Sequence, residues 1–121
     1  MSKRAVLSPN AQRDIRSIMA WSKDKFGVEA AHRYRTLLMQ VLDDILDDPE
    51  RPGSKERPEI MAQGARTYHF FFSRERVSGQ PVKDPRHFVL YRRGVDGGVE
   101  VARILHDSRD LVRHLPEDYR R

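Results

Sequence analysis

Hydrophobic and small residues near the start of the chain recur with a helical period. Ser8 and Pro9 precede the repeat, and together they form a helix start, because the serine hydroxyl can cap the first turn and proline needs no N–H partner at the first helical position. Phe26 and Gly27 mark its end, since glycine accepts the backbone conformation that commonly closes a helix. The pattern predicts one helix between these signals. Its apolar face is carried by Ala11, Ile15, Ile18 and Ser22.

A second helical repeat follows with almost no gap. It stops at Asp47-Asp48-Pro49, because the residue before a proline is disfavoured in the α region. Two amphipathic helices joined by so short a connection must fold back on each other, so residues 10–47 are predicted to form a helical hairpin. The second stripe consists of Ala31, Tyr34, Leu38, Val41 and Ile45, widened by Leu37, Leu42 and Leu46.

In the second half of the chain the period changes to that of β-strands. Asp96-Gly97-Gly98 is a strong signal for a tight hairpin between the last two strands, whereas residues 73–86 contain two prolines and a glycine and form a long hairpin loop. Residues 49–64 are expected to be irregular, residues 107–115 to form a short helix and residues 116–121 a frayed tail. The predicted strands are residues 4–7, 66–72, 87–91 and 99–105.

These elements predict an α+β fold in which an N-terminal helical hairpin packs on a small antiparallel β-sheet. A length of 121 residues suits a single domain with one core. The chain has no cysteine, no apolar run long enough to span a membrane and no secretory signal after its basic first residues, so we expect a cytoplasmic protein.

Charge is unevenly distributed along the chain. The net charge is +5, of which residues 61–121 contribute +4. A basic C-terminal half suits an anionic partner, either nucleic acid or an acidic protein segment, although a solvated basic surface explains the same charge. Direct binding to nucleic acid therefore stays open.

Candidate chemistry is sparse. His106, Asp110 and His114 are spaced for a weak metal site on the last helix, but a polar helix surface explains them better, and no metal or cofactor is predicted. Acid–base cleavage of RNA needs a base, an acid and cations, which Arg66, Arg103 and His106 could supply. The alternative is that both arginines hydrogen-bond carboxylates or carbonyls at the strand ends.

The order of elements and several motifs resemble the RelE/ParE toxin superfamily, and specifically its ParE branch. The resemblance covers about residues 4–115. The loop at residues 73–86 is longer than is usual for the branch. The matching motifs are Leu7-Ser8-Pro9-x-Ala11-x-x-Asp14-Ile15-x-x-Ile18, Phe26-Gly27, Asp48-Pro49, Gly64-x-Arg66, Phe88-Val89-Leu90-Tyr91-Arg92 and Val101-x-Arg103-Ile104-Leu105-His106-x-x-Arg109-Asp110.

This resemblance implies the toxin of a type II toxin–antitoxin system, neutralised by a ParD-like antitoxin. ParE-like members poison DNA gyrase, whereas RelE-like members cut messenger RNA on the ribosome. Arg66 matches an arginine that both branches share, and the C-terminal motif follows the ParE form. We therefore expect a binding inhibitor of gyrase rather than an enzyme. The alternatives are a ribosome-dependent endoribonuclease that uses Arg66, Arg103 and His106, or a degenerate, non-toxic interaction module.

Two sets of residues are expected to contact other macromolecules. Apolar side chains that flank the central helical stripes could receive an amphipathic antitoxin helix, namely Met19, Trp21, Leu37, Leu42 and Leu46. Basic residues on the sheet and in the C-terminal segment are expected to contact the target, namely Arg92, Arg93, Arg103, Arg109 and Arg113.

Overall fold

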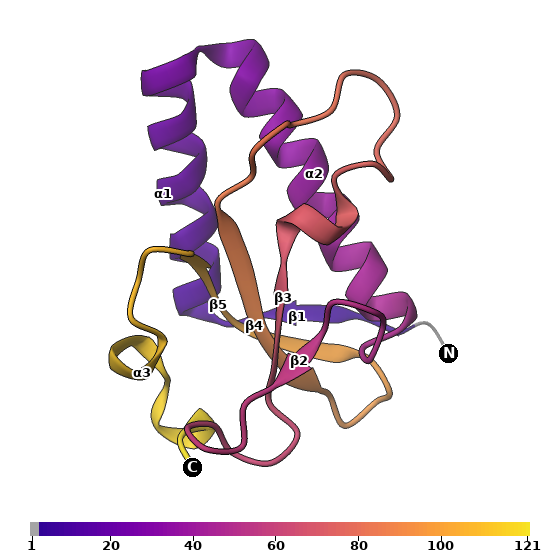
Figure 1. Cartoon of the computed structure of the whole chain (residues 1–121), viewed down its shortest axis with the longest axis vertical. Helices are drawn as coiled ribbons and strands as arrows, with labels where there is room; N and C mark the ends of the chain where they lie inside the picture. The colour runs from indigo at the N-terminus through magenta and orange to yellow at the C-terminus, as the bar shows by residue number, and fades with distance from the viewer. Residues whose placement is uncertain (1–2) are drawn as a thin grey trace.

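The computed structural model describes residues 3–121, which form a helical hairpin and a five-stranded sheet (Figure 1). In Figure 1 the hairpin occupies the upper part of the view and the C-terminal segment lies at the lower left. The elements in chain order are β1 (Ala5–Leu7), α1 (Pro9–Phe26), α2 (Val28–Asp47), β2 (Lys55–Glu56), β3 (Arg66–His69), the 3₁₀ helix η1 (Phe70–Ser73), β4 (His87–Arg93), β5 (Val99–His106), α3 (Leu111–His114) and the 3₁₀ helix η2 (Glu117–Tyr119).

The predicted helix signals are confirmed. The Ser8 hydroxyl accepts a hydrogen bond from the Ala11 N–H and also donates to the Ala102 carbonyl of β5, so one side chain caps α1 and fixes it to the sheet. Gly27 alone joins α1 to α2. Its φ of 91° and ψ of 172° lie in a region that is essentially restricted to glycine. The two helices therefore meet at a sharp corner and pack side by side.

The sheet is mixed, with the strand order β1-β5-β4-β3-β2. β3, β4 and β5 are antiparallel neighbours, as expected, and the tight turn predicted at Asp96-Gly97-Gly98 joins β4 to β5. β2 pairs antiparallel with β3 within residues 49–64, so the prediction that this whole segment is irregular is wrong. β1 differs, because it pairs parallel with β5 and places Leu7 opposite Val101. The helical hairpin between β1 and the rest of the sheet supplies the long connection that a parallel pair requires.

One face of the sheet packs against the helical hairpin and forms the main core. Tyr68, Val89 and Tyr91 are buried on this face, together with Leu37 and Val41 of α2. The helical stripes and the strand alternation thus meet as predicted, and the α+β class with a helical hairpin on a sheet is confirmed. No helix in the described part of the chain is both long and apolar enough to cross a lipid bilayer.

The opposite face of the sheet is also covered, and here the expectation of a frayed tail at residues 116–121 is wrong. Tyr119 is only 3% exposed, and residues 61 and 120 form a β-bridge. This segment folds back because the outward-facing apolar side chains of β4 and β5 would otherwise face water. The resulting second core contains Met61, Ala65, Leu90, Ala102, Leu105, Leu111, Leu115 and Tyr119.

The strand predicted for residues 66–72 ends earlier, at His69. The His69 Nδ1 atom accepts a hydrogen bond from the Phe71 N–H and starts η1. Ser73, at the end of η1, donates to the buried carboxylate of Asp44 at 2.6 Å. Phe70 is fully buried, whereas Phe71 and Phe72 are about half exposed, so the aromatic run is divided between core and surface rather than alternating along a strand.

Asp44 also organises the start of the long loop. Arg76 contacts its carboxylate at 2.9 Å, and Gln40 donates to it at 2.8 Å. Burial alone would raise the pKa of Asp44, but the hydrogen bonds from Ser73, Gln40 and Arg76 outweigh that effect and hold its pKa below the usual value. The carboxylate is therefore ionised at neutral pH and joins α2, η1 and the loop.

Candidate functional site

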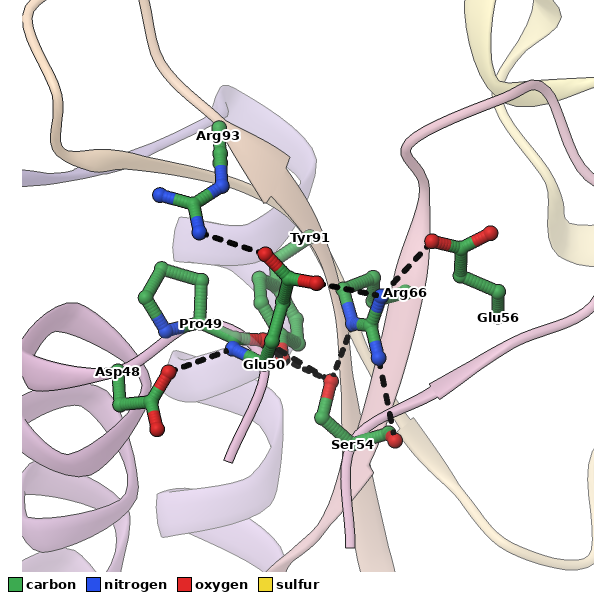
Figure 2. Close-up of polar contacts among 8 residues, drawn as sticks. All are labelled: Asp48, Pro49, Glu50, Ser54, Glu56, Arg66, Tyr91 and Arg93. Carbon is green, nitrogen blue, oxygen red and sulfur yellow. Dashed lines mark hydrogen bonds and ion pairs between the residues drawn. The ribbon is translucent and has the colours of Figure 1, made fainter. Parts of the chain in front are cut away.

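Arg66 is the centre of a polar network between the sheet and the connection that follows α2 (Figure 2). Its Nε atom donates to Ser54 Oγ at 2.6 Å, its Nη2 to the Ser54 carbonyl at 3.3 Å and its Nη1 to Glu56 at 2.8 Å. Ser54 Oγ also lies 2.6 Å from the Tyr91 hydroxyl, which donates to the Pro49 carbonyl. All the nitrogens of the guanidinium group are thus engaged inside the chain.

The network has a structural role. The Arg66 side chain is only 15% exposed. Glu50, which Figure 2 shows between the two guanidinium groups, pairs with Arg93 at 2.7 Å and lies 3.9 Å from Arg66. These contacts hold residues 48–56 against β3 and β4. The arrangement agrees with the structural alternative for Arg66 rather than with a phosphate contact.

Arg103 is engaged in the same way, on the other side of the sheet centre. Its Nε and Nη2 atoms donate to the two oxygens of Asp14 at 2.8 and 2.9 Å. Asp14 also accepts the Ile104 N–H at 2.9 Å. The hydrogen bond from Arg103 to Asp14 raises the pKa of this arginine above its usual value. This bidentate pair fixes α1 on β5. The Arg103 guanidinium group is therefore not free for the predicted contact with a target.

The three residues of the ribonuclease hypothesis are not assembled in one site. His106 and Arg103 line a common hollow of about 200 Å³, with Arg109 at its edge, but Arg66 does not line it. Since both arginines already bond carboxylates or serine, they are not available to stabilise charge on a phosphate group. The geometry therefore gives no support to catalysis by this set of residues.

The remaining predicted target-binding arginines fall into two groups. Arg92 pairs with Glu100 at 3.0 Å and with Asp118 at 2.8 Å, and its guanidinium carbon lies 4.3 Å from the centre of the Tyr119 ring. It thereby joins the C-terminal segment to β4. Arg93 pairs with Glu50, as described above, but keeps 59% of its side chain exposed.

Arg109 and Arg113 are the freer pair. Arg109 is exposed and forms no ion pair with a carboxylate within residues 3–121; its nearest polar side-chain contact is His114, at 3.3 Å. Arg113 is 82% exposed and lies 3.6 Å from Asp110, one turn earlier. Arg109 precedes α3 and Arg113 lies within it, so this short helix carries the accessible part of the predicted basic surface.

The residues expected to contact an antitoxin are also divided. Leu37 is fully buried and Leu42 is 7% exposed, so these two side chains belong to the core and cannot reach a partner unless the helices leave the sheet. Met19 and Leu46 are half-buried at the edge of the core. Trp21 is 51% exposed and contacts Phe26 edge-to-face. Trp21 is thus the most accessible of the five.

A polar cluster that the sequence patterns did not reveal lies where β4 begins. The Tyr34 hydroxyl contacts His87 Nδ1 at 2.6 Å and accepts the Arg86 N–H at 3.1 Å. Asp107 bonds His69 at 3.0 Å and the guanidinium group of Arg86 at 3.0 Å. Burial raises the pKa of Tyr34 to about 12 and lowers that of His87 to about 4. One sequence signal could have indicated this cluster. Tyr34 in a helical stripe and His87 in a strand are polar residues at positions where the pattern is apolar.

Comparison with known proteins agrees with this architecture. The model of the family "ParE toxin of type II toxin-antitoxin system, parDE" matches residues 5–111. The chain is 28% identical to Toxin ParE1 from two strains of Mycobacterium tuberculosis over 117 residues, which is 95% of this chain and 100% of each relative. It is 32% identical to Toxin ParE1 of Caulobacter vibrioides over 109 residues, covering 90% of this chain and 94% of the relative.

The fold and these matches define a class, namely small α+β proteins of type II toxin–antitoxin systems. Within that class, the chain belongs to the ParE toxin family. The predicted family is thereby confirmed. Membership in a type II system also implies an antitoxin as a partner.

If Arg66 is a structural residue, its loss lowers stability. We expect Arg66→Gln to reduce the free energy of unfolding by about 2 kcal/mol, because Ser54 and Glu56 lose a partly buried partner. Urea denaturation followed by circular dichroism measures the change. The control is Arg35→Gln on the exposed face of α2, which is expected to stay within about 0.5 kcal/mol of wild type. A variant with unchanged stability but no activity would contradict the structural role.

The lowered pKa of His87 predicts a specific dependence of stability on pH. The unfolded chain binds a proton on this histidine near pH 6.5, whereas the folded chain does so only near pH 4. The free energy of unfolding should therefore fall as the pH falls through this window, by about 2 kcal/mol between pH 7 and pH 5. Carboxylates with lowered pKa values act mainly below that range.

Urea denaturation of wild type and His87→Gln at pH 7 and pH 5 measures this contribution. The variant should be less stable at pH 7, because Tyr34 loses its partner, but should lack most of the loss on acidification. His32→Gln, an exposed histidine on α2, serves as the control and should keep the wild-type slope. Equal slopes for wild type and His87→Gln would show that His87 is protonated normally in the folded protein.

Proposed function

We propose that the protein inhibits DNA gyrase by binding to it, and that a ParD-like antitoxin neutralises this activity. Membership in the ParE family and the likeness to proteins named Toxin ParE1 support a toxin of this type. The choice between binding and catalysis rests on which arginines are free. Arg66 and Arg103 form hydrogen bonds within the chain, whereas Arg109 and Arg113 remain exposed at α3.

The basic segment around α3 suits recognition of an anionic surface. Two exposed guanidinium groups within five residues give a local positive field, and Asp110 offsets it only partly from 3.6 Å. Gyrase bound to DNA presents phosphate groups, which arginine binds well. The segment is also fixed in place, because Leu111 and Leu115 anchor it in the second core. A rigid basic surface loses little conformational entropy on binding.

The proposed antitoxin surface lies on the helical hairpin. Trp21 is its accessible centre, and Met19 and Leu46 are the half-buried members of the predicted set. An amphipathic helix could cover the exposed indole, which is the kind of aromatic anchor that dominates many protein interfaces. Because this surface and the α3 segment come from opposite ends of the chain, neutralisation and target binding can be tested with separate variants.

A supercoiling assay with purified gyrase tests the toxic activity. Wild-type protein should inhibit supercoiling, and Arg109→Glu combined with Arg113→Glu should weaken inhibition roughly tenfold or more, since both attractive charges become repulsive. The matched control is Arg33→Glu combined with Arg35→Glu on α2, which makes the same charge change away from α3. Both double variants need wild-type thermal stability for the comparison.

Induction of the protein in cells separates the alternatives. Primer extension on a translated message tests for cleavage of messenger RNA. Discrete new ends, with supercoiling unaffected, would contradict this proposal and favour the endoribonuclease. Unchanged growth after induction without any antitoxin would favour the non-toxic module. Inhibition that Arg109→Glu and Arg113→Glu left intact would remove α3 from the target surface.

A second experiment tests the antitoxin surface. Trp21→Ala should leave growth inhibition in place but weaken neutralisation by the co-expressed neighbouring antitoxin, with a loss of affinity of roughly tenfold or more. Growth with and without antitoxin, together with calorimetric titration of the purified pair, measures both effects. Val95→Ala in the β4–β5 turn, where the apolar side chain is fully exposed, is the control. Wild-type affinity of Trp21→Ala would move the antitoxin surface elsewhere.

A further inference from the structure

A cavity of about 500 Å³ lies between the tip of the helical hairpin and the long loop at residues 74–86. The end of α1 contributes Trp21 and Phe26 to its lining, and the loop contributes Pro81 and Val82. Its apolar part is therefore built from flat or rigid side chains. This volume is in the range of pockets that hold small organic molecules. The long loop therefore forms part of the cavity wall.

The polar part of the cavity contains His87 and His106, whose ring centroids lie 5.3 Å apart. His106 Nδ1 accepts the Ser108 N–H at 3.0 Å, so its Nε2 atom carries a proton. The Tyr34 hydroxyl accepts the Arg86 N–H and lies 2.6 Å from His87 Nδ1, so the Nδ1 atom of that ring is engaged and its Nε2 atom is left free. No hydrogen bond within residues 3–121 engages the Nε2 atom of either histidine.

Charge around the cavity favours an anion. Arg33, Lys83 and Arg86 line it together with a single carboxylate, Asp84. Arg86 is neutralised by Asp107, but Arg33 and Lys83 form no ion pair within residues 3–121. The cavity therefore has two imidazole Nε2 atoms without a partner in residues 3–121 and unpaired positive charge among its lining residues. These groups would satisfy an oxyanion, which accepts hydrogen bonds from several donors at once.

We propose that this cavity is a binding site for a small aromatic oxyanion, with its carboxylate or phosphate group at His87, His106 and Arg33 and its ring between Trp21 and Val82. His87 is 7% exposed and its Nε2 atom forms no hydrogen bond within residues 3–121, so this atom is available to a ligand group in the cavity. The inference does not depend on gyrase inhibition, because none of its groups belongs to the exposed pair Arg109 and Arg113.

Calorimetric titration with 2-naphthoate and with 2-naphthyl phosphate, in a buffer without other carboxylates or phosphate, tests the site. At least one anion should bind saturably, whereas the neutral 2-naphthamide should bind roughly tenfold more weakly or not at all. Tighter binding of 2-naphthoate would identify a carboxylate as the preferred group, and tighter binding of 2-naphthyl phosphate would identify a phosphate. Trp21 is the only tryptophan, so its indole N–H signal in a ¹⁵N–¹H correlation spectrum reports occupancy directly.

Variants locate the bound anion. His106→Phe and Arg33→Gln should each weaken binding roughly tenfold while the chain stays folded, since both side chains are partly exposed. His32→Phe and Arg35→Gln make the same changes on the exposed face of α2 and should bind like wild type. Failure of both anions to bind, equal binding of 2-naphthamide, or unchanged affinity in His106→Phe and Arg33→Gln would each overturn the proposal.

Discussion

Pairing of arginines with carboxylates inside the chain is the constraint on which this small structure depends. Asp14 with Arg103 fixes α1 to the sheet, and Asp44 with Arg76 fixes the long loop to α2. Arg92 joins the C-terminal segment to β4 through Glu100 and Asp118. A third of the residues are charged, so a chain of this size could not bury enough apolar surface without using some of its charges as internal contacts.

The same pairing decides which positive charges face other molecules. The chain carries 23 lysines and arginines, yet in its basic second half several arginines already have carboxylate partners. Net charge is therefore a poor guide to the binding surface of this protein. Two groups of accessible positive charge bear on binding: Arg109 and Arg113 at α3, and Arg33 with Lys83 at the cavity between the helical hairpin and the long loop. The two surfaces differ in character, since only the cavity combines charge with aromatic walls.

Local signals were predictable from the sequence, whereas contacts between distant residues were not. Ser8, Pro9 and Gly27 act through the backbone of their own turn, so the helix ends followed from the sequence. The end of β3 at His69 depends on Ser73 reaching Asp44, 29 residues away, and a strand was predicted there instead. The partners of Arg103 and His87 are separated from them by 89 and 53 residues, so the bidentate pair and the polar cluster appear only in three dimensions.

The parallel pairing of β1 with β5 has a consequence for the order of events during synthesis. Leu7 pairs opposite Val101, the Ser8 hydroxyl bonds Ala102, and Asp14 bonds Arg103. β1 and α1 leave the ribosome first, but they can form these contacts only after β5 has been made, because the contacting residues are about 90 positions apart. The nascent chain therefore completes its sheet, and the surfaces built on it, only when translation is almost finished.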